Sequence, residues 1–225
     1  MIVVVYIFPM NGAGGFFDLA LRFIQTYTKF PAGHDHQVVV VCNGSPVTEE
    51  AQCLFGEIQN CLFLEHDNSG YDIGGFQKAS REIPGDLMVF FGATAYIRGP
   101  GWLARMVDAW QKHGDTLYGT TGNRGHVAVG VQPHVRTTGF FLSASLFNQY
   151  PHQVTTPGGR YPFEHGPECL TTWIKSRRLH PFIVAWTGEY PEALWDSIPN
   201  GFRQGNQSNV ITGDRMTRIP YGCDP

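Results

Sequence analysis

The acidic residue best placed for chemistry in this sequence is Asp72, in the glycine-rich segment NSGYDIGG at residues 68–75. The segment follows a short apolar run at 62–64, which predicts a strand, and it precedes a helical pattern. Open α/β sheets bind ligands outside the carboxyl ends of their strands, so a carboxylate here can accept hydrogen bonds from a base or a ribose hydroxyl. Asp72 can equally cap a helix that begins at Ile73 or Gly74, and one residue can serve both roles.

Two other features lie near the ends of expected elements. Asn68 and Gly70 are typical turn residues, since glycine permits a positive φ and the close approach of a ligand to the backbone. Glu168 directly precedes a predicted helix at 169–179, where the helix dipole stabilises a negative charge. A simple stabilising role at the helix start therefore remains open for Glu168.

Several familiar catalytic motifs are incomplete or missing. Gly12 and Gly14 begin a dinucleotide-binding fingerprint, but Phe17 stands where its third glycine belongs, and Cys-Asn-Gly at 42–44 replaces the acid expected after the second strand. The chain has no Tyr-x-x-x-Lys pair, no G-x-S-x-G elbow and no G-x-x-x-x-G-K-[ST] loop. Nicotinamide, serine-hydrolase and P-loop chemistry are therefore disfavoured.

The cysteine and histidine spacings favour neither a metal site nor a disulfide framework. The five cysteines are odd in number and show no C-x-x-C spacing. His34 and His36 come just before a predicted strand at 38–42, where we expect a solvated pair of loop residues.

The charge balance excludes some partners. The 225 residues include 16 Lys and Arg against 19 Asp and Glu, a formal net charge of −3, whereas proteins that coat nucleic acid or anionic membranes carry a basic excess. The first apolar run stops at Pro9 without a basic flank, and no stretch approaches the ~18 apolar residues of a membrane helix. We therefore expect a cytoplasmic protein with no nucleic-acid partner and no integral membrane segment.

Alternating strand and helix patterns predict an α/β fold. The β-branched run at 2–8 is typical of a parallel strand with both faces buried. Further strands are expected at 38–42, 62–64, 86–91, 116–119, 137–142 and 181–186. Helices are expected at 16–27, 102–111, 143–147 and 169–179, and two more are expected to begin at residue 48 and to end at residue 81. Residues 150–167 are expected to form a loop. The pattern indicates one Rossmann-like domain with a mostly parallel central sheet flanked by helices, and little periodicity after residue 186.

Four segments stand in a specific order along the chain: the turn at 68–76, the strand at 87–91 with Gly-Pro-Gly-Trp-Leu at 99–103, the strand at 138–142, and Glu168 with the basic helix end before residues 181–184. Their order resembles a glycosyltransferase of the GT-A-type fold, and the first segment is most similar to the N-x-G-x-D-x-G segment of the rhamnan-synthesis group. The resemblance covers residues 2–186 and implies a nucleotide-binding half at 1–100, an acceptor-side half at 101–186 and a tail or lid at 187–225.

The resemblance also implies a function and a set of site residues. It implies transfer of a hexosyl or deoxyhexosyl group from a nucleotide-sugar to a glycan or lipid-linked acceptor in polysaccharide biosynthesis, with inversion. The expected donor-binding residues are Pro9, Asn43, Asn68, Gly70, Asp72, Gly74, Gly92 and Thr94. Glu168 is the expected base that takes the acceptor proton, with Glu164 in reserve. A nucleotidyltransferase is disfavoured because the chain lacks a G-x-G-T-R-type loop.

One departure from the family pattern concerns the metal. The D-x-D motif of the family would follow Phe91, where this chain has Gly92, Ala93 and Thr94, and these offer a hard cation no carboxylate. We therefore expect either a transferase without metal or cofactor, or a catalytically silent nucleotide- or carbohydrate-binding domain. Without a metal, cationic or backbone donors must stabilise the leaving diphosphate. The candidate cations are Arg98, Arg124, His126, His134, Arg136, Arg203, Arg215 and Arg218.

The tail after residue 186 carries two further expectations. Trp186, Tyr190 and Trp195 are expected to pack over the domain rather than stack on sugar rings. The polar, glycine-containing loop at 201–207 is a candidate lid over the site.

Overall fold

The structure is a computed structural model that describes residues 1–10, 16–125, 131–198, 201–203, 207–215 and 217. Its centre is an eight-stranded sheet with the order β11-β10-β6-β9-β4-β1-β2-β3. These strands are β1 (Ile2–Pro9), β2 (Gln37–Asn43), β3 (Leu62–His66), β4 (Leu87–Phe91), β6 (Tyr118–Gly119), β9 (Gly139–Ser143), β10 (Phe182–Ala185) and β11 (Gly188–Pro191). All except β9 and β11 point the same way, so the predicted mostly parallel sheet is confirmed.

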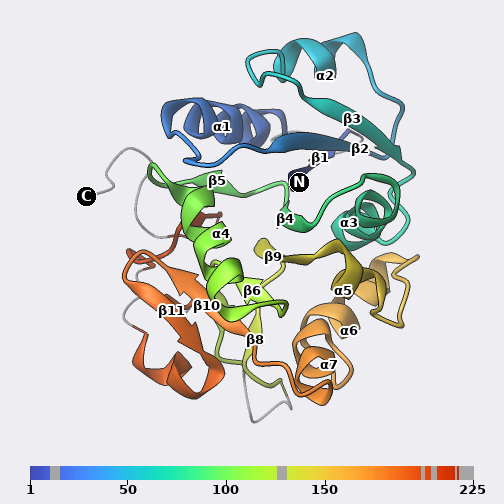
Figure 1. Cartoon of the computed structure of the whole chain (residues 1–225). Coiled ribbons are helices and arrows are strands. Elements are labelled where there is room, and N and C mark those ends of the chain that lie inside the picture. The colour runs from blue at the N-terminus through green and yellow to red at the C-terminus, as the bar shows by residue number, and fades with distance from the viewer. Residues whose placement is uncertain (11–15, 126–130, 199–200, 204–206, 216, 218–225) are drawn as a thin grey trace.

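Helices cover both faces of this sheet (Figure 1). The helices are α1 (Phe16–Lys29), α2 (Glu49–Leu54), α3 (Tyr71–Glu82), α4 (Trp102–His113), α5 (Ala144–Asn148), α6 (Arg160–His165) and α7 (Leu170–Ser176). Apolar residues of α1, α2 and α4 pack on one face, whereas those of α3, α5, α6 and α7 pack on the other. Across the described residues, no helix has the length and apolar character needed to cross a membrane.

The central strand β1 shows why its sequence is continuously apolar. Successive side chains of a strand point to opposite faces of the sheet. Val4 and Tyr6 therefore enter the core beneath α1 and α4, while Val3 and Val5 enter the core beneath α3 and α5. Neither face meets solvent, so the strand is apolar apart from the Tyr6 hydroxyl, which is hydrogen-bonded.

The predicted loop at 150–167 is wrong, because it contains the short 3₁₀ helix η2 (Pro157–Gly159) and α6. The tail, for which the sequence shows little periodicity, contains β11, the 3₁₀ helix η3 (Glu192–Ser197) and β12 (Thr212–Gly213). These elements are only two to six residues long, too short for a periodicity to emerge. β12 pairs with the distant β5 (Tyr96–Ile97), a contact that no local pattern can predict.

The strand expected at 137–142 is also shorter than predicted. It begins at Gly139, and Arg136 and Thr137 belong to the connection from β8 (His134–Val135). β8 forms a small antiparallel pair with β7 (Gly122–Asn123). This connection enters the edge of the sheet where β4 ends, because Gly139 pairs with Phe91.

Helix α3 begins earlier than predicted, so the alternative that Asp72 caps a helix beginning at Ile73 or Gly74 is wrong. The N-cap is Gly70, which adopts a left-handed φ of 77°, and Tyr71 is the first helical residue. Asp72 therefore lies in the first turn, where its Oδ1 accepts from the Ile73 N–H at 3.1 Å. The turn-forming role of Gly70 is confirmed, and Asn68 also has a positive φ of 69°.

Replacing Gly70 with alanine is expected to lower the free energy of unfolding by about 2–5 kcal/mol. A Cβ at Gly70 would lie 1.9 Å from the Val154 carbonyl oxygen, in addition to its left-handed backbone. Gly101 is the matched control, since it also precedes a helix with a φ of 73° but has no neighbouring atom within 4 Å of the position that a Cβ would take. Gly101→Ala should cost only the backbone strain, about 1–2 kcal/mol. Equal losses in urea unfolding would contradict the predicted clash.

Candidate active site

The strand order has a switch point between β1 and β4. The chain adds β2 and β3 on one side of β1, and then places β4 on the other side. Ligands of open α/β sheets bind outside the carboxyl ends of the strands at such a point. Here those ends are Pro9 of β1 and Phe91 of β4, followed by residues 92–94. We call this region the switch-point edge, and it contains the predicted donor residues Pro9, Gly92 and Thr94.

Asp72 lies at this edge, next to the end of β4. Its Oδ2 is 3.9 Å from the position that a Cβ on Gly92 would occupy. Burial raises the pKa of the Asp72 carboxyl to about 6. The positive charge of Arg160 opposes this rise in pKa, and the negative charge of Glu164 adds a smaller increase. Asp72 therefore changes its charge close to neutral pH, as a group used in proton transfer or polar recognition does.

Glu164 reaches the same edge from α6. Its Oε1 accepts from the Thr137 N–H at 3.4 Å, directly before the strand that pairs with β4. Its negative charge raises the pKa of Asp72, so the two carboxyl groups act on each other. Arg160, one helical turn earlier in α6, lies over the Tyr71 ring at 5.9 Å and connects α6 to the start of α3. This contact helps to hold Glu164 near Asp72.

A histidine pair adjoins the carboxyl groups. The rings of His134 and His165 have centroids 5.8 Å apart, and His134 Nδ1 contacts the Gln132 carbonyl oxygen at 2.8 Å. Burial lowers the pKa of His134, an effect that the Gln132 carbonyl and then the Glu164 charge oppose. His134 is one of the candidate cations from the sequence, but burial favours its neutral form.

Glu168, in the connection between α6 and α7, contacts His152. Its Oε2 is 3.4 Å from His152 Nε2, and 76% of its side chain is exposed. The Glu168 carbonyl oxygen accepts from the Tyr150 hydroxyl at 2.9 Å. The charge of Glu164 therefore acts on Asp72, whereas the Glu168 side chain lies exposed beside His152, and the catalytic role of either residue stays a prediction.

Three other residues that are predicted to bind the sugar donor contact other parts of the protein. The buried side-chain amide of Asn43 is hydrogen-bonded to His66 Nδ1 at 2.6 Å, and this ring nitrogen also lies 3.2 Å from the Asn68 backbone nitrogen. A Cβ at Gly74 would lie 2.1 Å from the Ser69 carbonyl oxygen, so this glycine allows α3 to pack closely. The close approach at Gly70 is made by the backbone at Val154, as described above.

The residues after β4 do not fit a divalent metal. Gly92 and Ala93 carry no side-chain oxygen, and Thr94 offers a single hydroxyl, whereas Mg²⁺ and Mn²⁺ favour several carboxylate oxygens. Within the described residues, no group of three His, Cys, Asp or Glu side chains is placed to hold a metal ion. The backbone here is fixed by Tyr6, whose hydroxyl donates to the Ala93 carbonyl at 2.8 Å, and by Arg22, which donates to the Thr94 carbonyl at 3.1 Å.

Two of the candidate arginines bind other residues of the protein. Arg98 is buried and donates to the Gln207 carbonyl, and Arg124 forms a surface ion pair with Asp196. Arg203 and Arg215 are exposed. His126, Arg218 and the glycine-rich turn at 11–15 lie outside the described residues.

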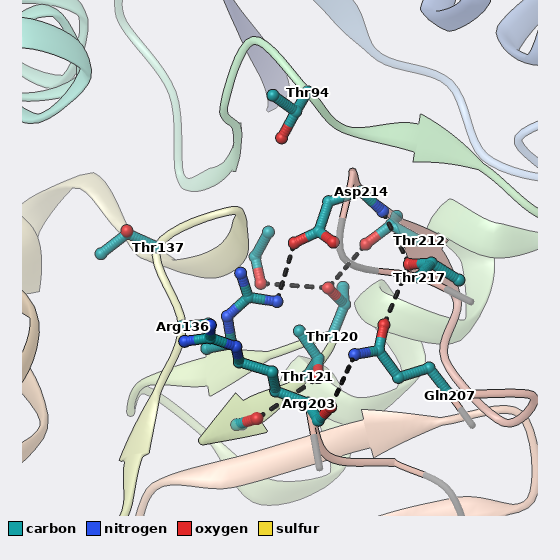
Figure 2. A network of polar contacts seen from close by, with 12 residues as sticks. Thr94, Thr120, Thr121, Arg136, Thr137, Arg203, Gln207, Thr212, Asp214 and Thr217 are labelled. Atoms are coloured by element: carbon teal, nitrogen blue, oxygen red, sulfur yellow. Dashed lines mark hydrogen bonds and ion pairs between the residues drawn. The ribbon is translucent and has the colours of Figure 1, made fainter. Parts of the chain in front are cut away.

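A polar network that the sequence does not predict joins the tail to this part of the protein (Figure 2). Arg136 Nη1 lies 2.7 Å from Asp214 Oδ2, and both side chains are at least nine-tenths buried. The hydroxyls of Thr120 and Thr212 are 2.6 Å apart, next to this ion pair in Figure 2. Arg136 is a candidate cation in the sequence, but Asp214 lies in a tail without periodicity, so no local signal points to their pairing.

The packing role expected for the tail aromatics is confirmed at Trp195. This side chain is buried, packs against Phe202 with ring centroids 5.8 Å apart, and donates to the Tyr190 carbonyl at 3.0 Å. Trp186 lies against Gly99, where a Cβ would come within 2.9 Å of its ring. The tail therefore covers the domain with these side chains.

Comparisons with known proteins give weak likenesses of fold. No protein-family model and no curated protein matches this chain. HddC from Yersinia pseudotuberculosis is 10% identical with a TM-score of 0.49, over 69% of this chain and 83% of that chain. Mouse xyloside xylosyltransferase 1 is 10% identical with a TM-score of 0.49, over 82% and 85%. The mannosyltransferase PcManGT from Pyrobaculum calidifontis, in complex with GDP-Man and Mn²⁺, is 14% identical with a TM-score of 0.47, over 66% and 46%. Likenesses of this degree assign no activity to the chain.

Proposed function

We propose that this chain is a glycosyltransferase that moves a hexosyl or deoxyhexosyl group from a nucleotide-sugar to a glycan or lipid-linked acceptor. The observation that carries the proposal is that two carboxyl groups lie by the carboxyl end of β4, Asp72 beside Gly92 and Glu164 on the Thr137 N–H. A transferase needs a ligand site at this edge of the sheet and a carboxylate that can take the acceptor proton. The resemblance of the sequence to the GT-A-type family, including the segment that contains Asp72, supports the same function.

In this proposal the two carboxyl groups have different tasks. Asp72, next to Gly92, accepts a hydrogen bond from the donor, and Pro9 and Thr94 border the nucleotide. Glu164 is the base, because its carboxylate shares the edge with Asp72, whereas the Glu168 carboxylate is largely exposed beside His152. The proposal thus assigns the role of base to Glu164 instead of Glu168.

The proposed reaction inverts the anomeric centre. The acceptor oxygen attacks the anomeric carbon from the face opposite the diphosphate, and a new carbon–oxygen bond forms as the bond to the diphosphate oxygen breaks. Glu164 takes the proton of the acceptor hydroxyl, and the nucleoside diphosphate leaves with the bonding electrons. General-base assistance of this kind contributes about 10²–10⁴-fold to a rate.

We further propose that the transfer needs no divalent metal. The uncharged residues 92–94 at the end of β4 support this, as does the poor fit of the neighbouring donor set to a hard cation. A cytoplasmic location, a role in polysaccharide biosynthesis and the division into donor and acceptor halves belong to the same proposal and rest on the sequence.

The proposal is tested by incubating the protein with UDP-, GDP- and dTDP-sugars, with and without EDTA. We expect release of nucleoside diphosphate from at least one donor, measured by chromatography, at a rate that EDTA leaves unchanged. Binding of a nucleotide without any release would indicate a silent binding domain instead. The absence of a thermal shift with every nucleotide would overturn the proposed function, and loss of release in EDTA would overturn metal independence.

A further inference from the structure

The buried ion pair between Arg136 and Asp214 lies close to the switch-point edge but outside the Asp72 and Glu164 pair. Arg136 precedes Thr138, whose carbonyl oxygen accepts from the Gly92 N–H at 3.2 Å. The Arg136 N–H itself donates to the Thr121 carbonyl at 3.2 Å. The backbone around Arg136 is therefore tied to the residues that follow β4, where the metal-binding acids of the resembled family would stand.

The chemistry of this pair suits the binding of an anion. A guanidinium presents a planar fork of N–H donors that matches either a carboxylate or a phosphate. Here one carboxylate oxygen of Asp214 lies 2.7 Å from Arg136 Nη1, with 9% of the Arg136 side chain and 5% of the Asp214 side chain exposed. Within the described residues, Arg136 Nη1 makes an ion pair with Asp214 but no hydrogen bond of regular geometry. The guanidinium is thus buried, charged and imperfectly bonded.

Stability alone gives a weak reason for this arrangement. Removing two charges from water costs about as much as their attraction returns, so a buried ion pair is often no more stabilising than apolar residues of similar size. A buried guanidinium that remains imperfectly bonded calls for another explanation, such as a ligand.

Asp214 is supplied by a tail segment that is fixed around it. β12 pairs with β5, Thr212 is hydrogen-bonded to Thr120, and the Asp214 N–H donates to the Thr217 hydroxyl at 2.9 Å. Figure 2 shows these tail residues gathered about Asp214 on one side of Arg136. The tail therefore holds the Asp214 backbone in place beside the guanidinium.

We propose that Arg136 binds the diphosphate of the donor and that Asp214 competes with it, holding the guanidinium until a phosphate replaces the carboxylate. The inference rests on the proposed function for the identity of the anion, and it names the cation that takes over from the metal. Because the carboxylate repels phosphate at close range, removing its charge must strengthen phosphate binding, whereas removing the arginine must weaken it. If the ion pair were only structural, the two substitutions would not change phosphate affinity in opposite directions.

The test is a metal-free titration with sodium pyrophosphate, followed by calorimetry. We expect Asp214→Asn, which keeps an oxygen for Arg136, to bind pyrophosphate at least tenfold more tightly than the wild type, and Arg136→Gln at least tenfold more weakly. Lys175→Gln and Glu192→Gln, which break a surface ion pair of 2.7 Å, are the matched controls and should leave binding unchanged. Uridine, guanosine and thymidine should bind all variants equally, since they carry no phosphate.

Arg136→Gln alone leaves a buried carboxylate without its partner, so a second variant guards against misfolding. The double variant Arg136→Gln/Asp214→Asn removes both charges, and thermal melting reports whether it folds. We expect it to fold and to bind pyrophosphate as weakly as Arg136→Gln. Tight binding by the double variant, or weaker binding by Asp214→Asn, would overturn the inference.

The outcomes separate this inference from the proposed function. Sugar transfer by a wild type whose pyrophosphate affinity is unaffected by either single substitution overturns the role of Arg136 and leaves the transferase standing. Opposite effects of the two substitutions in a protein that releases no nucleoside diphosphate support the anion site and overturn the transferase.

Discussion

Replacing Asp72 with asparagine is expected to stabilise the fold at neutral pH while removing most of the transfer activity. Burial at the switch-point edge raises the pKa of this carboxyl to about 6, so its charged form is unfavourable in the folded protein. Asparagine has nearly the same shape and carries no charge. The stability gain at pH 7.5 should be about 1–3 kcal/mol, since a tenfold change in proton affinity corresponds to about 1.4 kcal/mol.

The raised pKa of Asp72 determines at which pH the substitution stabilises the fold. The pKa of Asp72 in the folded protein lies above the value of about 3.9 for an unfolded chain. Well below pH 4 the carboxyl is protonated in both states, and the wild type keeps its full stability. As the pH rises from about 4 to about 6, the unfolded chain releases this proton while the folded protein still holds it, so the wild type loses stability that Asp72→Asn retains. The loss is complete once the pH is above 6.

Urea unfolding at pH 4 and pH 7.5 measures this difference. Asp67→Asn is the control, because hydrogen bonds from Ser69 lower the pKa of Asp67, which should make that substitution destabilising at neutral pH. A stability difference for Asp72→Asn that does not grow with pH would contradict the raised pKa.

Although Asp72→Asn should be more stable than the wild type, its activity should be lower. We expect about a 100-fold loss in kcat/KM, mostly through weaker donor binding, because the lost carboxylate accepts from the donor in the proposed site. Retained donor affinity, measured by calorimetry, would exclude Asp72 from the donor site. Stabilisation with loss of activity is the pattern expected of a residue kept for function.

The sheet could be predicted from the sequence because its central strands are buried on both faces. β1 and β2 are continuous apolar runs, and each is followed by a helical pattern, so a parallel α/β fold follows from local information. The short helix α6 could not be predicted in the same way. It contains Pro162 and only six residues, and it is held by its contacts with α3 and α7 rather than by its own pattern.

The residues of the candidate site also differ in whether local sequence predicts them. Asp72 can be predicted because its glycine-rich turn and its strand are neighbours in the chain. Glu164 is only a reserve candidate in the sequence, because its position depends on Arg160 packing over Tyr71, a contact between distant segments. The pairing of Arg136 with Asp214 depends on the path of the tail, which carries no pattern of its own.

Glu164→Gln is expected to lower kcat by about 10²–10⁴-fold while leaving donor affinity within about threefold of the wild type. Glutamine keeps a side-chain oxygen that can accept from the Thr137 N–H, so the fold should persist, but it cannot take a proton. Glu168→Gln is the comparison variant, since Glu168 lies in the connection directly after the helix that carries Glu164, while only Glu164 acts on Asp72. A large loss with Glu168→Gln and none with Glu164→Gln would return the base to Glu168.

A second measurement separates a base from a residue that merely supports the loop. The charge of Glu164 helps to raise the pKa of Asp72, so Glu164→Gln should lower that pKa, whereas Glu168→Gln should leave it in place. NMR titration of the Asp72 carboxyl detects this shift without any substrate. A lower pKa together with lost turnover and intact donor binding would place both carboxyl groups in one site. An unchanged pKa would show that Glu164 does not act on Asp72, and the proposed base would lose the contact on which its assignment depends.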